Sequence, residues 1–231
     1  MKKILSIVII IGVILGIFYF LNKKEVVVPV TTIPIEKNTK STNKIDVEQG
    51  EFCFAKFGTP NSSGLYDKYT LRLILDGGKV TGELNLLPAE KDIKTGEIKG
   101  TVGVFDKVMM TRVAILEWFT FAGNTDTEKI TIVFGKDTAS IKEGTNTLSL
   151  AELPCLDLIE RTNVENYLND NISKLSPVKA VLGGTWYVVS ATVDMIKNSG
   201  TVIYEDGHIQ EKKNFSYTTN EKGEVVSLNI F

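Results

Sequence analysis

The chain has few of the residues that build metal and redox centres. Its 231 residues include two cysteines and a single histidine, His208. Two cysteines exclude an iron–sulfur protein, a disulfide-rich scaffold and a cysteine-rich zinc site, and one histidine excludes a multi-histidine metal centre. We therefore expect no metal and no cofactor.

The sequence also lacks the short motifs that mark well-known chemistries. It contains no G-x-S-x-G nucleophile elbow, no phosphate-binding G-x-x-x-x-G-K-[ST], no H-E-x-x-H and no C-x-x-C. These absences exclude most well-marked hydrolase, nucleotide-binding and metalloprotein mechanisms. We predict that the chain is not an enzyme.

Basic charge is scarce beyond the first residues. The 26 basic residues nearly balance the 28 acidic ones, but four of the lysines stand within residues 1–24, where there is no acidic residue. The rest of the chain is therefore mildly acidic. Because such a surface repels the phosphate backbone, we expect no nucleic acid among its partners.

One long apolar run is present at the amino terminus. The 18 residues from Ile4 to Leu21 carry no charge, and as a helix they would cover about 27 Å, close to the hydrocarbon core of a bilayer. The length of the run and the lack of an A-x-A pattern after it favour an uncleaved anchor over a cleaved signal peptide. We predict a transmembrane signal-anchor helix over 1–24, which contacts the lipid bilayer through residues 4–21. The expected location is the cell membrane, single-pass, with the C-terminal domains extracytoplasmic.

Two further regions follow along the chain. Residues 25–47 are rich in Thr, Lys, Asn and Ser and predict an extended polar stalk. From 48 to 157 the apolar period is two, as in Tyr69–Leu75, and Gly, Asp and Asn turns separate the runs. This pattern predicts a small antiparallel β-barrel or sandwich, with glycines 82, 100 and 103 at close bends. The apolar run Met109–Phe121 lacks a clean period and is predicted as a strand.

The two cysteines lie near the two ends of this β-rich region. A bond between Cys53 and Cys155 would tie the first strand to the end of the last one, and closing a loop of about 100 residues stabilises by up to roughly 4.7 kcal/mol in the chain-entropy model. Two buried free thiols are the alternative. We favour the disulfide, given an extracytoplasmic location.

The last region, 158–231, changes character. Thr162 or Asn163 can cap an amphipathic helix that ends before Pro177. Strand-like runs follow at Thr185–Asp194, Thr201–Glu205, His208–Thr218 and Glu224–Phe231. The predicted fold class is therefore mainly β with some α (α+β): an N-terminal transmembrane helix, a small barrel or sandwich, then one helix and a four-stranded antiparallel meander.

Three resemblances bear on this prediction, and the lipocalin-type one among them is rejected. The helix with its following meander is similar to cystatin-like folds, which mostly bind other molecules. Gly183–Ser190 is similar to the G-x-W start of lipocalin-type barrels, but too few residues follow it for eight strands. Six short segments carry a third resemblance: Val80–Gly82, Pro88–Asp92, Gly96–Gly100, Val164–Tyr167, Gly183–Val188 and Tyr204–His208. Through these segments, most of the region after the stalk resembles a group of bacterial single-pass membrane-anchored proteins to which no function is attached.

Three groups of residues are candidates for a binding site. Glu90, Lys91 and Asp92 stand in an expected loop, where paired carboxylates can hold Ca²⁺ or act as acid and base, although such loops are commonly only solvated. Glu205 and His208 flank a turn, where a carboxylate near the imidazole would make a pH-sensitive contact. The alternative is that His208 is an ordinary exposed histidine. Trp118 and Trp186 would serve a ligand surface if exposed and would otherwise fill the core.

These signals favour a binding or interaction module without catalytic activity. Its expected partner is an envelope protein, a glycan or a small ligand. A structural subunit of a cell-envelope complex is the first alternative, and an envelope hydrolase that uses Glu90 and Asp92 is the second.

Overall fold

The computed structural model describes residues 49–120, 126–143 and 146–231, which belong to one compact unit, Asn43–Phe231. These residues form a series of strands interrupted by a single helix. The elements are β1 (Gln49–Phe57), β2 (Lys68–Asp76), β3 (Lys79–Leu87), β4 (Lys94–Val102), β5 (Thr111–Thr120), β6 (Asp126–Gly135), β7 (Thr138–Glu143), β8 (Asn146–Leu153), α2 (Cys155–Leu175), β9 (Tyr187–Asp194), β10 (Ser199–Glu205), β11 (Gln210–Thr219) and β12 (Val225–Ile230).

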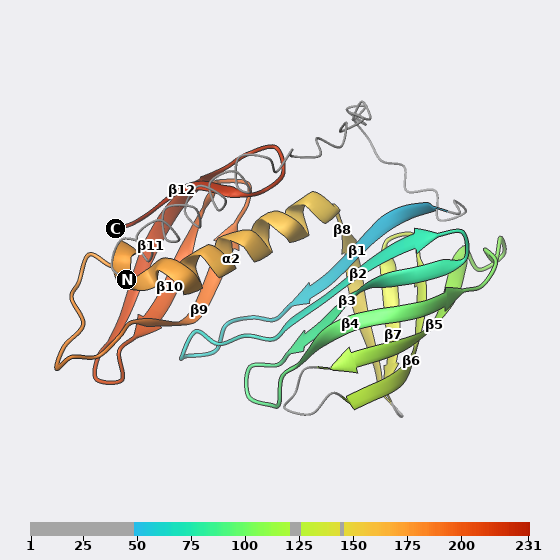
Figure 1. Ribbon diagram of the computed structural model, residues 1–231, viewed down its shortest axis with the longest axis horizontal. Helices are drawn as coiled ribbons and strands as arrows, with labels where there is room; N and C mark the ends of the chain where they lie inside the picture. Colours follow the sequence, from blue (N-terminus) through green and yellow to red (C-terminus); the bar gives the residue numbers. More distant parts are fainter. Residues whose placement is uncertain (1–48, 121–125, 144–145) are drawn as a thin grey trace, which may run out of the picture. The chain divides into compact units, whose positions relative to one another are not determined.

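The first eight strands form a closed barrel. Each strand pairs antiparallel with the next one in sequence, and β8 returns to pair with β1 through Cys53↔Leu153 and Ala55↔Ala151. Figure 1 shows the strands following one another around the barrel, from β1 in blue to β8 in yellow. Closure gives every strand two neighbours and leaves no open sheet edge. The β-barrel prediction is confirmed.

The barrel interior is filled by side chains from alternate positions of each strand. On β5, Ala114, Leu116 and Trp118 point inward and are buried, whereas Val113 and Ile115 occupy the alternate positions and are exposed. The apolar run here lacks a clean period because apolar residues occupy both faces of the strand. The buried core of the barrel consists of Phe52, Phe54, Leu71, Leu73, Leu75, Val80, Leu84, Leu86, Ile98, Ala114, Leu116, Trp118, Ile130, Ile132, Phe134, Ala139, Ile141 and Leu150.

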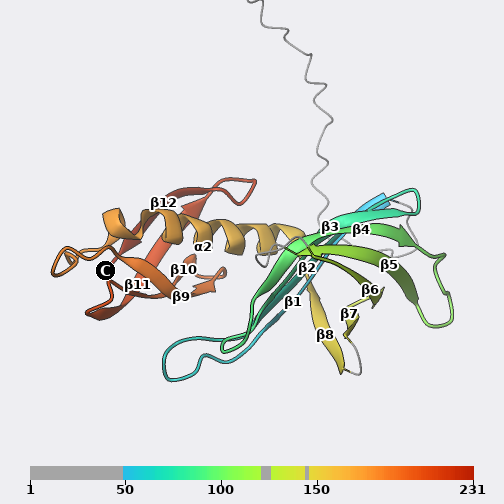
Figure 2. The ribbon, with the colours of Figure 1, turned by 60° about the horizontal axis from the view of Figure 1, so that its bottom comes forward.

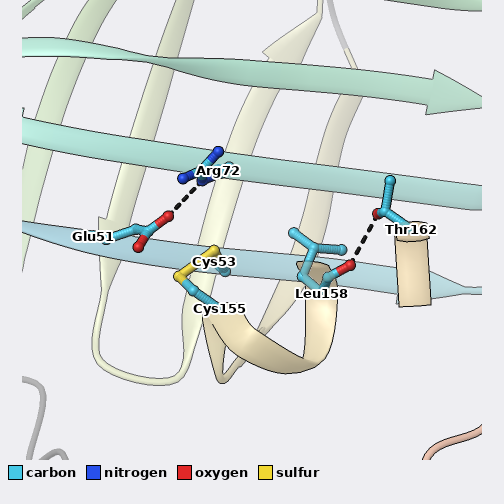
Figure 3. The surroundings of a disulfide bond; sticks show 6 residues. All are labelled: Glu51, Cys53, Arg72, Cys155, Leu158 and Thr162. Atoms are coloured by element: carbon cyan, nitrogen blue, oxygen red, sulfur yellow. Dashed lines mark hydrogen bonds and ion pairs between the residues drawn. A yellow bond between two sulfur atoms is a disulfide. The ribbon is translucent and has the colours of Figure 1, made fainter. Parts of the chain in front are cut away.

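Helix α2 begins directly after the barrel. Its N-cap is Pro154 and its first residue is Cys155, seven positions before the predicted cap at Thr162. The hydroxyl of Thr162 instead donates to the carbonyl of Leu158 within the helix (2.9 Å; Figure 3). The prediction of a cap at Thr162 or Asn163 is wrong, because a threonine in the middle of a helix can satisfy its hydroxyl on the preceding turn. Proline is compatible with a helix start, since its fixed φ fits there and the backbone N–H that it lacks would have no hydrogen-bond partner within the helix.

The last four strands form a separate antiparallel sheet in the order β12-β11-β10-β9. Helix α2 packs against this sheet (Figure 2), and its buried Val164, Leu168 and Ile172 join the sheet side chains in one apolar cluster. Trp186 and Tyr204 meet there edge to face, with ring centroids 4.9 Å apart. The helix therefore supplies the apolar layer that the sheet needs on that face.

The predicted α+β fold class with an N-terminal transmembrane helix is corrected. The described residues are mostly β, with a closed barrel, a four-stranded sheet and α2 as the one helix. Within 49–120, 126–143 and 146–231, no helix has both the length and the apolarity needed to cross a bilayer. Helix α2 carries charged residues along its length and packs on the sheet. This finding corrects the predicted single-pass membrane location as well. The anchor (1–24) and stalk (25–47) predictions concern residues outside those that the structure describes.

Candidate functional site

The two cysteines are bonded to each other. Cys53 lies on β1 and Cys155 is the first residue of α2, with their Cα atoms 5.1 Å apart (Figure 3). The disulfide prediction is confirmed. In the described ranges, these cysteines and Glu51 are also the one group of potential metal ligands whose atoms lie within 4.8 Å of one another. Because both sulfurs are in the disulfide, this group offers no thiolate to a metal ion.

A pocket of about 250 Å³ lies where the barrel, α2 and β9 meet, and we call it the helix–barrel pocket. Four separate stretches of chain build it: the start of β2 with the loop before it, the end of β3 with the β3–β4 loop, α2, and β9. Most of its wall is apolar. The lining residues are Leu65, Tyr66, Lys68, Leu87, Pro88, Ala89, Ile93, Glu165, Asn169, Val188, Val189, Ser190 and Ala191.

An ion pair between the barrel and the helix forms one side of this pocket. The Nζ of Lys68 donates to Oε2 of Glu165, and the two side chains are only 25% and 11% exposed. The other carboxylate oxygen, Oε1 of Glu165, is buried and has no hydrogen-bond partner. A buried acceptor without a donor is costly, so a ligand that donates a hydrogen bond to this atom would remove that cost.

Tyr66 forms a second contact between the barrel and the sheet. Its hydroxyl donates to the carbonyl of Ala191 on β9 (2.6 Å). Burial and, secondarily, the nearby charge of Glu165 raise the pKa of Tyr66 to about 12. The phenol therefore remains a neutral donor at neutral pH and holds the β1–β2 loop to β9.

The loop residues Glu90, Lys91 and Asp92 are exposed and lie outside this pocket. The neighbouring Pro88, Ala89 and Ile93 line it instead. The amide of Asn61 donates weakly to Glu90 (3.4 Å), linking the β3–β4 loop to the β1–β2 loop. Neither carboxylate belongs to a cluster with the spacing of metal ligands within the described residues. Glu90 and Asp92 are therefore solvated residues of the β3–β4 loop.

The two tryptophans are core residues in two different cores. Trp118 is 1% exposed inside the barrel, and Trp186 is 4% exposed between α2 and the sheet. The indole N–H of Trp186 donates to the carbonyl of Val178 (2.9 Å). Both tryptophans therefore fill the core, and neither forms an exposed ligand surface.

Glu205 and His208 stand at the β10–β11 turn, but the residue that organises this turn is Asp206. Its carboxylate accepts hydrogen bonds from the backbone N–H groups of Val181 (2.6 Å), His208 (2.9 Å) and Ile209 (2.9 Å). These bonds, the one from Ile209 foremost, lower the pKa of Asp206. Glu205 accepts from Tyr187 and Gln210, and the His208 side chain is exposed.

The structure does not bring the sequence-predicted residues together at one place. The residues that form the helix–barrel pocket, Tyr66, Lys68 and Glu165, were not candidates at the level of the sequence. They carry no motif, and Lys68 and Glu165 are 97 positions apart. The one available signal was Glu165 itself. It stands next to the predicted apolar stripe of the helix, where its side chain is expected to be partly buried, and a buried carboxylate needs a partner.

No protein-family model, curated protein or solved structure matches the chain. The resemblances to cystatin-like folds and to a bacterial protein group therefore stay predictions.

Proposed function

We propose that the chain is a non-catalytic binding module, and that the helix–barrel pocket holds its ligand. The observation that carries the proposal is the buried, unpartnered Oε1 of Glu165 in an otherwise largely apolar pocket. Small-molecule sites have this composition: an apolar wall with a few polar groups that fix orientation, at a junction between structural parts.

The charges around Glu165 define the ligand further. Lys68 already balances its carboxylate, so a cationic ligand would add a second positive charge beside the Lys68 ammonium. A neutral N–H donor satisfies Oε1 without this repulsion. The ligand class that fits is therefore an amide with a small apolar body, whose N–H meets Glu165 and whose apolar part meets Leu65 and Val188.

Calorimetric titration of the full chain with 3-methylbutanamide tests the proposal. The matched probe 3-methylbutanoate has the same apolar body but no N–H donor, and we expect it to bind more weakly. Glu165→Gln should weaken amide binding about tenfold, since the acceptor changes from a charged carboxylate to a neutral carboxamide and the hydrogen bond becomes weaker. Asp170→Asn, an exposed carboxylate change on the same helix, is the control and should leave binding unchanged. Equal binding of both probes, or of the wild type and Glu165→Gln, would contradict the proposal.

A second candidate function, as a structural subunit that binds another protein, has its own observation. Val113 and Val133 are paired across β5 and β6, and both are exposed on the outer face of the barrel beside the exposed Ile115. Adjacent exposed apolar residues are typical of a protein-binding surface. If this surface is used, replacing Val113 and Ile115 by threonine abolishes any association of the full chain that sedimentation detects.

A further inference from the structure

A second cavity lies at the end of the barrel where β2 turns into β3 and β4 into β5. Its volume is about 530 Å³, and its lining includes Gly78, Val102, Val104, Phe105, Lys107 and Arg112. We call it the barrel-mouth cavity. It shares no lining residue with the helix–barrel pocket, so an inference drawn from it is independent of the function proposed above.

Arg112 is the unusual member of this cavity. It stands at an inward position of β5, directly across from Phe134 on β6, and is only 7% exposed. Its Nε is buried without a hydrogen-bond partner. No ion pair within the described parts of the chain includes Arg112. A guanidinium taken out of water without a counter-charge is unfavourable, because nothing repays its lost hydration.

The acidic side chain of the adjoining loop forms no ion pair with this guanidinium. Asp106, in the β4–β5 loop, accepts hydrogen bonds from the backbone N–H groups of Val108 (2.8 Å) and Met109 (3.0 Å) and so organises its own loop. The one other charged residue of the cavity wall is Lys107, which is also basic. The barrel-mouth cavity is therefore positively charged, with an apolar wall formed by Val102, Val104 and Phe105.

We propose that the barrel-mouth cavity binds a small carboxylate that has an apolar body. A carboxylate matches the planar fork of a guanidinium and can accept from two of its nitrogens at once. A single buried cation balances a monoanion, and the side chains of Phe105 and Val102 give the apolar body a surface to contact. A phosphate carries more negative charge than a carboxylate and has no apolar part to contact this apolar wall.

The test is a titration of the full chain with 3-phenylpropionate, followed by NMR at the side-chain Nε–H of Arg112 and by calorimetry. We expect the Nε–H resonance to shift on binding, a readout that a merely structural arginine would not give. The alcohol 3-phenylpropanol has the same body without the charge, and should bind at least about tenfold more weakly. Inorganic phosphate should leave the Nε–H resonance in place.

Two variants complete the experiment. Arg112→Met keeps the length of the side chain and removes the charge, and should weaken 3-phenylpropionate binding about tenfold or more. Lys136→Met, an exposed lysine in the β6–β7 turn outside the cavity lining, should bind as the wild type does. The proposal is overturned if the alcohol binds as well as the acid, if phosphate alone shifts the Nε–H resonance, or if Arg112→Met binds normally. The three probes decide the matter on the wild-type chain even if the methionine variant does not fold.

Discussion

Lys68 at the start of β2 and Glu165 in the middle of α2 form an ion pair across 97 positions of sequence. Together with the Cys53–Cys155 disulfide, it helps to hold α2 and the sheet to the barrel. The Tyr66 hydroxyl on Ala191 and the guanidinium of Arg161, 4.2 Å above the ring of Phe57, do the same. The ion pair and the Tyr66 contact also line the helix–barrel pocket, so stability and binding are linked there.

Removing Lys68 should destabilise the protein more than removing an exposed lysine. Lys68→Met leaves the largely buried carboxylate of Glu165 without its counter-charge, and we expect a loss of about 2 kcal/mol in the free energy of unfolding. Lys197→Met breaks the exposed pair with Asp194, and should change the same quantity by less than about 0.5 kcal/mol. Urea unfolding of both variants measures the difference. The double variant Lys68→Met with Glu165→Gln should lose less than the sum of the two single changes. Strict additivity would show that the two side chains do not interact.

Removing the disulfide should be the most destabilising of these changes. Cys53 and Cys155 are separated by 102 positions, and their bond restricts the unfolded chain over the whole barrel. The double variant Cys53→Ala with Cys155→Ala should lose about 4 kcal/mol of unfolding free energy. Wild-type protein under reducing conditions is the control and should unfold at the same urea concentration as the double variant. An unchanged midpoint in both samples would mean that the bond does not form.

Glycine at position 100 should be necessary for the pairing of β4 with β5. A Cβ atom there would lie 2.1 Å from the carbonyl oxygen of Ile115, so the two strand backbones must move apart to admit it. Gly100→Ala should cost about 1–3 kcal/mol of unfolding free energy. Three residues on, a Cβ at Gly103 would sit 3.6 Å from the carbonyl oxygen of Val113, an ordinary contact, and Gly103→Ala is the matched control. Thermal unfolding of both variants tests this, and equal melting temperatures would contradict it.

Asp206 should make the stability of the β10–β11 turn sensitive to acid. Its pKa is lowered in the folded state by backbone hydrogen bonds, so the folded state binds the proton less readily than the unfolded state does. The stabilisation is complete above the unfolded pKa, near 3.9, and disappears as the pH falls through the lower folded value. Asp206→Asn should lower the melting temperature at neutral pH, and the difference from wild type should shrink below about pH 4. His208→Gln is the control, because it keeps the backbone N–H that donates to Asp206 and removes only the imidazole charge, the smallest of the causes that lower the pKa of Asp206. A difference that stays constant down to pH 2 or so would disprove this role.

The local pattern of the sequence was sufficient to predict most of the strands. Period-two alternation identified the runs that became β2 and β3, because a strand with one buried face must alternate. The start of α2 was missed because two cap-forming residues at 162 and 163 gave a stronger signal than Pro154.

The candidate sites were harder to predict for a different reason. Tyr66 and Lys68 meet Glu165 only when the start of β2 packs against α2, and no short motif records that packing. Arg112 lay inside the run without a clean period, so its inward position could not be read until the register of β5 was known. The tryptophans and the Glu90–Asp92 loop were visible as residue types, but composition does not distinguish a core or a solvated loop from a site.

The closure of the barrel by its first and last strands has a consequence for synthesis of the chain. Of the eight barrel strands, β1 leaves the ribosome first, and β8, the strand that closes the barrel beside it, follows only after the other six. Throughout that interval β1 presents an open edge and the apolar side chains of Phe52 and Phe54. An open apolar edge is the feature through which nascent β-proteins aggregate. The half-made barrel is therefore the species on which a chaperone would act, and oxidation of Cys53 must await the arrival of Cys155.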